Sequence, residues 1–312
     1  MPQTLSLNGD WSLAWHDDFP QFLTAETAPL RTQLTAHVPE PVHQTLMRHG
    51  LLDDPRVGLN SLKARWVEEQ FWVYRRVFTS PPSSQEPWEE GSFWLVFDLL
   101  EFDAVIYLNG QEIGRHANAH RPARFEVSGK LRPEGEENTL VVRLDAGLYS
   151  VADKPAADYF PTPLSSLSKI HWMRKGQWQR GWDWQQRLMN VGILGDVRLV
   201  WDEAPLVTQL QVFATVSDDL SEATFHARAF FENTLDNPYE GELYIYVLSD
   251  DDPVKQPSQE QKITVPIGSS SQVISITLKN PDLWWPKGHG EPNKYGVIVD
   301  VIFFFGSDSM RV

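Results

Sequence analysis

The feature that most constrains the fold is a series of short runs of β-branched and aromatic residues, each closed by turn-forming residues. In the first half of the chain these runs fall at residues 71–74, 93–97, 105–108 and 140–142. Such residues favour extended backbone because their side chains pack well on a pleated surface. Helical periodicity is scarce by comparison. The sequence therefore predicts an all-β protein.

Two local signals refine this prediction. Asn109-Gly110 follows an apolar run, and both residues tolerate the positive φ of a type I′ turn, so we expect a β-hairpin there. The best helical signal is Val42 to Met47, where Val42 and Leu46 are four residues apart and Gly50 can act as a C-terminal cap. This segment supports one or two helical turns.

The strand runs form two groups, separated near residue 203. Residues 201–205 close the run 197–200, and a new alternating pattern begins at Leu210. Further strand runs follow at residues 225–231, 243–248, 263–267, 273–278 and 297–305. Their number and spacing are typical of an immunoglobulin-like sandwich. We therefore predict a larger jelly-roll β-sandwich over residues 1–202 and an immunoglobulin-like β-sandwich over residues 203–312.

Composition excludes several classes of function. The net charge of −15 disfavours nucleic acid, whose binding depends on Lys and Arg. The sequence contains no apolar stretch long enough for a membrane span, so no membrane partner is expected. It also has no cysteine, which rules out thiolate metal sites, and no cofactor or metal is expected. The first residues lack a secretory signal, which predicts a cytoplasmic protein.

Tryptophan is concentrated in one segment. Four of the thirteen Trp, at positions 172, 178, 182 and 184, fall within thirteen residues and are interleaved with polar side chains. Indole rings can stack on the apolar face of a pyranose, and a carboxylate such as Asp183 can bind its hydroxyls. The alternative is that these Trp are core residues of the sandwich. Gly181 and the polar flanks favour a loop, so we predict sugar-binding roles for Trp178, Trp182, Asp183 and Trp184.

Other candidate sites are weaker. Glu68 and Glu69 are expected on a strand, where adjacent side chains point to opposite faces and cannot flank one glycosidic bond. His116 and His120 have the spacing of helical metal ligands, but they follow the predicted hairpin and have no third ligand. Neither pair is predicted to form a catalytic or metal site.

Several blocks of sequence resemble the non-catalytic N-terminal domains of glycoside hydrolase family 2, specifically its β-mannosidase branch. They are Leu7-Asn8-Gly9-Asp10-Trp11, Val38-Pro39-Glu40-Pro41-Val42-His43, Gly50 to Pro55, Trp66 to Glu69, Trp72 to Arg76, Val105 to Gly110, Gly114, His116, Glu137 to Leu140, Arg174-Lys175, Gly181-Trp182-Asp183-Trp184 and Leu283-Trp284-Trp285-Pro286 with Gly288 and Gly290. The resemblance implies a galactose-binding-like jelly roll followed by an immunoglobulin-like domain. It also implies that Trp182 and Asp183 reach the active-site mouth of a following barrel and help bind a terminal mannose. Gln185-Gln186 departs from the Gly-Pro that is typical there.

Catalysis in this family uses two Glu on a (β/α)₈ barrel, which needs roughly 250 further residues. No alternation of strands and helices suggests such a barrel, so we expect a glycoside hydrolase fragment without activity of its own. Its expected partners are a β-linked mannoside or related glycoside and the absent C-terminal barrel. One alternative is a free-standing, lectin-like carbohydrate-binding protein. A purely structural β-sandwich module is another.

Overall fold

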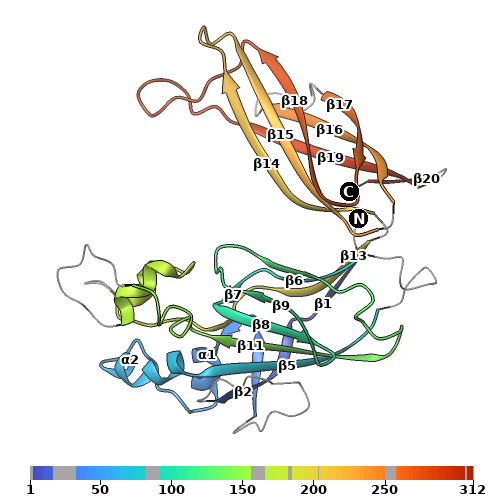
Figure 1. The fold of residues 1–312 in the computed structure, drawn as a ribbon. Coiled ribbons are helices and arrows are strands. Elements are labelled where there is room, and N and C mark those ends of the chain that lie inside the picture. The colour runs from blue at the N-terminus through green and yellow to red at the C-terminus, as the bar shows by residue number, and fades with distance from the viewer. Residues whose placement is uncertain are drawn as a thin grey trace. The chain divides into compact units, whose positions relative to one another are not determined.

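The computed structural model describes residues 3–16, 33–81, 92–155, 166–181, 185–202, 204–235, 237–249, 258–305 and 308–311. Apart from Gln3 and Ser92, which group with the second unit, the described chain divides after Val200 into two compact units. They are coloured mainly from blue to yellow-green and from yellow to red in Figure 1. Strands dominate both units, which confirms the all-β prediction. No helix in these ranges is long and apolar enough to cross a membrane.

In its described part, the first unit contains three sheets. A four-stranded sheet has the order β1 (Gln3–Ser6), β13 (Val197–Asp202), β6 (Ser92–Phe97) and β10 (Ala123–Glu126). A six-stranded sheet has the order β3 (Leu34–Val38), β2 (Gly9–His16), β5 (Phe71–Thr79), β11 (Glu137–Asp145), β8 (Asp103–Leu108) and β9 (Gln111–His116). A small third sheet joins β4 (Glu40–Pro41), β12 (Gly192–Ile193) and β7 (Leu100–Glu101). This arrangement is the predicted jelly-roll sandwich.

The core of the jelly-roll unit lies on the inner face of the six-stranded sheet. Trp11, Trp72 and Tyr74 are among its largest fully buried side chains. Both indole N–H groups donate to backbone carbonyls, Trp11 Nε1 to Leu7 O at 2.8 Å and Trp72 Nε1 to Val67 O at 2.9 Å. These two indoles are core residues, because each ring is buried and its polar atom is satisfied.

The predicted hairpin and helix are both confirmed. Asn109 and Gly110 join β8 to β9 with φ of 52° and 83°, as a type I′ turn requires. Helix α1 (Val42–Arg48) ends with Gly50 at φ 68°. The Gly50 and Leu51 amides donate to Met47 O at 3.0 Å and Leu46 O at 2.9 Å, which is the Schellman arrangement.

The other helical segments are short. They are α2 (Asn60–Lys63), η1 (Ala64–Glu69), η2 (Ser166–Trp172) and η3 (Gln177–Arg180), the last three being 3₁₀ helices. The strand expected at Glu68 and Glu69 is therefore wrong, since both residues lie in η1. Glu68 is buried there in an ion pair with Arg187, a contact distant in sequence that local strand propensity could not foresee.

The second unit is the predicted immunoglobulin-like sandwich. One sheet has the order β14 (Leu206–Val216), β15 (Glu222–Asn233) and β18 (Gly268–Lys279). The other has the order β17 (Ser258–Val265), β16 (Tyr239–Ser249), β19 (Tyr295–Phe305) and β20 (Asp308–Arg311). The strand expected at 263–267 instead ends at Val265, because Gly268, at φ 85°, begins the next strand after a tight turn.

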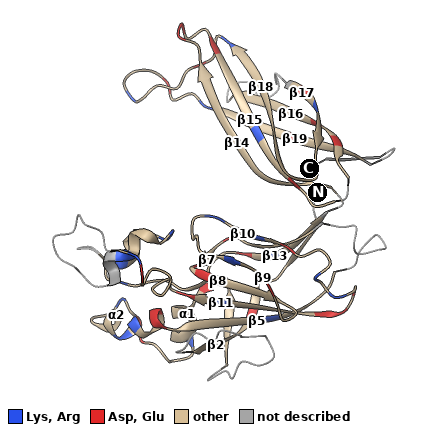
Figure 2. Ribbon diagram, in the orientation of Figure 1, with Lys and Arg blue, Asp and Glu red and all other residues tan. Residues whose placement is uncertain are grey.

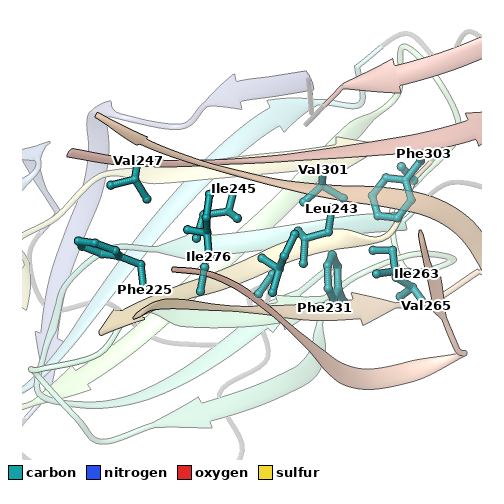
Figure 3. Close-up of a cluster of buried hydrophobic side chains, with 14 of the residues drawn as sticks. Phe225, Phe231, Leu243, Ile245, Val247, Ile263, Val265, Ile276, Val301 and Phe303 are labelled. Carbon is teal, nitrogen blue, oxygen red and sulfur yellow. The ribbon is translucent and has the colours of Figure 1, made fainter. Parts of the chain in front are cut away.

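The interior of the immunoglobulin-like unit is formed by alternate residues of both sheets. Figure 3 shows these side chains meeting between the sheets, with Phe225, Phe231 and Ile276 facing Leu243, Ile245 and Phe303. The rings of Phe231 and Phe303 make an edge-to-face contact at 6.2 Å. The apolar residues at alternate positions of these strands therefore form one apolar layer between the two sheets.

Candidate functional site

Three of the four predicted sugar-binding residues, Trp182, Asp183 and Trp184, lie outside the described residues. The structure describes the chain on either side of them, up to Gly181 and from Gln185 onward. The fourth, Trp178, lies in η3, and 56% of its surface is exposed. The candidate site is therefore defined by the two flanks of this segment and by the side chains that the flanks present.

Backbone contacts bring the two flanks together. Leu188 N donates to Gln179 O at 3.0 Å, and Asn190 N donates to Gln179 Oε1 at 2.9 Å. A Cβ atom at Gly181 would lie 2.9 Å from the backbone nitrogen of Arg187, closer than van der Waals contact allows. Gly181 also has φ 91°, which side-chain-bearing residues rarely adopt. Glycine at this position thus permits the close approach of the flanks.

A buried ion pair holds the first flank. Lys175 Nζ lies 2.9 Å from Glu101 Oε2, and the Lys175 side chain is fully buried. The other carboxylate oxygen, Glu101 Oε1, accepts from Gln179 Nε2 at 3.0 Å. Lys175 Nζ also donates to Asn190 O, on the opposite flank. Burial lowers the pKa of Lys175, while the charge of Glu101 raises it.

A second buried carboxylate holds the other flank. Glu68 in η1 forms an ion pair with Arg187, and its Oε1 accepts from Met189 N at 3.2 Å. Burial raises the pKa of Glu68, and the nearby positive charge of Arg187 opposes that rise. Closer to the 182–184 segment, Gln186 Nε2 donates to Pro55 O at 3.0 Å. Both ends of the 182–184 segment are therefore fixed to the body of the jelly roll by buried charged groups.

The exposed side chains on the first flank combine flat apolar rings with polar groups. Trp172 is 47% exposed, and its Nε1 donates to Pro155 O at 2.9 Å, which fixes the ring. The Lys154 ammonium lies 5.8 Å from the Trp172 ring centroid. His171 and Arg174 are exposed beside it. Such a surface has the stacking and hydrogen-bonding groups that a pyranose needs. Within the described ranges, no three His, Asp or Glu side chains gather as a metal site would require.

Sequence reasoning identified the segment but missed the residues that hold it. Glu68, Glu101, Lys175, Gln179 and Arg187 received no positioning role, because their partners lie 11 to 121 residues away in the sequence. The only sequence signal was the adjacency of Arg174-Lys175 and Arg187 to the tryptophan cluster. His43, in α1, is also buried. Burial lowers its pKa to about 4, with a further contribution from the charge of Lys175.

Comparison with known proteins places both units in one family. A model described as glycosyl hydrolase 2 galactose-binding domain-like matches residues 21–195, and a glycosyl hydrolases family 2 model matches residues 206–302. Beta-mannosidase B of Emericella nidulans is 32% identical over 269 residues, covering 85% of this chain and 30% of that protein. Beta-mannosidase B of Neosartorya fischeri is 30% identical over 306 residues, covering 96% and 33%.

Solved structures agree with these matches. The β-D-mannosidase of Dictyoglomus thermophilum superimposes with a TM-score of 0.75 at 28% identity, covering 99% of this chain and 36% of that one. A β-glucuronidase of Bacteroides uniformis, at 18% identity and a TM-score of 0.63, shares the fold. The chain spans about 30% of the length of the first curated relatives it matches. It belongs to glycosyl hydrolase family 2.

Proposed function

We propose that the chain is the non-catalytic N-terminal region of a β-mannosidase-like retaining exo-glycosidase and contributes its 182–184 segment to sugar binding. The observation that carries this proposal is the clamped pair of flanks. Two buried carboxylates, Glu68 and Glu101, fix the residues on either side of the segment. A binding loop that is held at both ends loses less conformational entropy when a ligand binds.

The chemistry of the segment suits a sugar. Trp178 presents an exposed indole on the adjacent 3₁₀ helix, and Trp182 and Trp184 add two more to the sequence. Indoles stack on the C–H face of a pyranose, and Asp183 can accept hydrogen bonds from its hydroxyls. The relatives that match most of the chain are named β-mannosidases, so we propose a β-linked mannoside or a related glycoside as the ligand.

In this proposal the bond-breaking chemistry takes place elsewhere. A retaining glycosidase needs two carboxyl groups about 5 Å apart, one as acid/base and one as nucleophile. We place both on a following (β/α)₈ barrel, which the jelly roll and the immunoglobulin-like unit would help to orient. The 312-residue chain alone should therefore not turn over an aryl β-mannoside, and clear turnover would contradict this assignment.

The test of the binding role is Asp183→Ala in the longer enzyme. We expect kcat/KM for an aryl β-mannoside to fall about a hundredfold, because a charge-assisted hydrogen bond contributes about 1.5–3 kcal/mol. Asp153→Ala is the matched control, since Asp153 is an exposed carboxylate on the same unit and should leave the kinetics unchanged. Unchanged kinetics for the Asp183 variant would refute the role.

A second function is favoured by the exposure of Trp172 and Trp178, since the 312-residue chain presents these rings by itself. In that case the chain would be a free-standing, lectin-like carbohydrate-binding protein. Titration calorimetry of the 312-residue chain with mannose and short β-mannosides separates the two functions. Affinity that disappears in Trp178→Ala would support the lectin, whereas no affinity fits a subsite completed by the barrel.

A further inference from the structure

A pocket opens on the jelly-roll unit where strands β2 and β5 separate. β2 pairs with β3 from Gly9 to Leu13, but it pairs with β5 only from Ser12 to His16. The first residues of β2 have therefore left β5, and a pocket of about 250 Å³ lies in that region. The residues that line this pocket are Asp10, Ser12, Gln33, Arg75, Arg76 and Val77. It shares no residue with the flanks of the 182–184 segment.

Two neighbouring arginines give the pocket its charge. Adjacent residues on a strand point to opposite faces, yet Arg75 and Arg76 both line the pocket. They can do so because the pocket lies at the gap between β2 and β5, which side chains reach from either face of the sheet. β5 carries no other charged residue, and the pair is its one blue segment in Figure 2. Positive charge is thus gathered at one point of a chain whose net charge is −15.

Arg76 is held across the gap between the two strands. Its Nη1 donates to the backbone carbonyl of Asp10 at 2.5 Å, which joins β5 to β2 beyond the end of their ladder. Its Nε is buried and has no acceptor in the described part of the chain. A buried donor that has no acceptor is destabilising, and such groups are rare in folded proteins. The Arg76 guanidinium therefore retains hydrogen-bonding capacity beyond the contact that fixes it.

The other charged residues of the pocket leave an excess of positive charge. Arg75 is exposed, and within the described ranges its side chain forms no hydrogen bond or ion pair. The one carboxylate of the lining, Asp10, is already engaged, since its Oδ1 contacts Nδ1 of His37. Two guanidinium groups thus face the pocket against a single carboxylate that has a partner of its own. An anion placed between Arg75 and Arg76 would relieve the repulsion between them.

We propose that this pocket, called here the Arg75–Arg76 pocket, binds a small oxyanion, namely a phosphate, sulfate or carboxylate group. The planar guanidinium presents its N–H groups as a fork that matches the paired oxygens of such anions. Gln33 Nε2 donates to Ser12 Oγ, and in that arrangement the Ser12 hydroxyl can still donate and the Gln33 carbonyl can still accept. These neutral groups suit the hydroxyls of a molecule that carries the anion. This inference does not rest on the proposed function.

Titration calorimetry of the 312-residue chain tests the pocket with three probes: inorganic phosphate, sulfate and glucuronate. The ionic strength is held constant, because added salt screens the attraction between exposed charges. We expect at least one of these anions to bind with a dissociation constant on the order of 1 mM. Neutral glucose, which has a hydroxymethyl group where glucuronate has its carboxylate, is the control and should not bind. Binding of phosphate or sulfate identifies a tetrahedral anion, and binding of glucuronate identifies a carboxylate.

Arg75→Gln assigns the binding to this pocket. It should weaken the affinity for the anion by about tenfold or more, because it removes a charged fork that donates to the ligand. Arg75 is exposed, so the melting temperature should hardly change. Arg115→Gln is the matched control, since Arg115 is an exposed arginine on β9 of the same sheet and pairs with Glu112. It removes the same charge and should change the affinity by less than about twofold.

Val77 supplies a second, independent measurement. It lines the pocket and is 43% exposed, so Val77→Asp should fold while it places a carboxylate against the anion. We expect this variant to lose about tenfold or more in affinity and Val77→Thr, which adds no charge, to keep it. Equal affinities for the Asp and Thr variants would place the anion elsewhere and refute the proposal. So would the absence of binding by all three anions at about 10 mM, or an equal loss in the Arg75 and Arg115 variants.

Discussion

The interiors of the two units hold different chemistry. The jelly-roll unit buries Glu68, Glu101 and Lys175, whereas Asn233 is the sole buried polar residue in the described part of the immunoglobulin-like unit. These three charged residues contact the flanks of one surface segment. The interior of the second is a continuous apolar layer between its sheets (Figure 3).

The difference shows what each interior does. Apolar burial stabilises a sandwich without specifying one loop geometry, because the hydrophobic effect is non-directional. A buried ion pair is costly to desolvate but directional, so it fixes the groups that it joins. We infer that the jelly roll accepts this cost in order to position residues near its proposed sugar-binding segment. Four substitutions test this contrast.

Lys175→Ala should have the largest effect. It leaves Glu101 buried without its cation, and breaking a buried pair in this way costs about 3–5 kcal/mol. Denaturant-induced unfolding of the jelly-roll unit measures the loss of unfolding free energy. Lys130→Ala is the control, because Lys130 and Glu126 are each about one-third exposed and such a pair contributes at most about 1 kcal/mol. Equal losses for the two variants would remove the contrast between the units.

Leu243→Ala probes the apolar interior of the other unit. Leu243 is fully buried between the sheets, so its truncation should cost about 2–5 kcal/mol and lower the immunoglobulin-like transition in calorimetry. Leu210→Ala, at an exposed position of β14, should cost less than about 1 kcal/mol in the 312-residue chain. An equally large effect of the two variants would contradict the assignment of the core to the layer between the sheets.

Gly181→Ala tests the closure of the flanks. The added Cβ meets the Arg187 backbone at a φ that alanine rarely adopts, so we expect a loss of about 1–3 kcal/mol. Gly268 of the immunoglobulin-like unit is the control, because it has φ 85° but open space around its Cβ position. Denaturant unfolding of Gly268→Ala should show only the loss of stability that comes from placing alanine at a positive φ. If both variants lose the same free energy of unfolding, the close approach of Gly181 to the Arg187 backbone contributes nothing to stability.

Asp145→Asn should have the smallest effect and the clearest pH dependence. Burial, with the nearby charge of Asp103, raises the pKa of Asp145 to about 6 in the folded protein. The folded state then binds a proton more tightly than the unfolded state, so this group makes the protein less stable as pH rises from about 4 to about 6. Above pH 6 the penalty is complete.

The variant should therefore be more stable than the parent at pH 7 and nearly equal to it at pH 4. We expect about 1–2 kcal/mol at pH 7, since each pKa unit corresponds to about 1.4 kcal/mol and asparagine weakens the 2.7 Å bond from Gly147 N. Denaturant unfolding of both proteins across this pH range gives the difference. A difference in the free energy of unfolding between the two proteins that does not change with pH would contradict the raised pKa of Asp145.

Local patterns predicted local structure well. The Asn109-Gly110 hairpin and the capped helix at Val42–Arg48 follow from backbone preferences of a few adjacent residues. The strand expected at Glu68 failed for the opposite reason. Glu68 lies instead in η1, where it is buried in an ion pair with Arg187, 119 residues away. Strand propensity reflects its surroundings more than helix or turn propensity does.

The candidate site divides in the same way. The sequence alone located the tryptophan-rich segment, and Trp178 is exposed as a binding residue must be. The roles predicted for Trp182, Asp183 and Trp184 stay predictions. The residues that clamp the flanks could not be predicted, because a buried lysine and an exposed one look alike in a single sequence.

The sequence by itself determined the all-β class, the hairpin, the capped helix and the position of the tryptophan-rich segment. Each depends on alternation or on residues close together in the chain. Only the tertiary structure decided which charges are buried and which flanks meet. Those features depend on contacts such as the one between Glu101 and Gln179, which are 78 residues apart. A linear pattern records what each residue prefers, whereas packing decides which of its preferences is met.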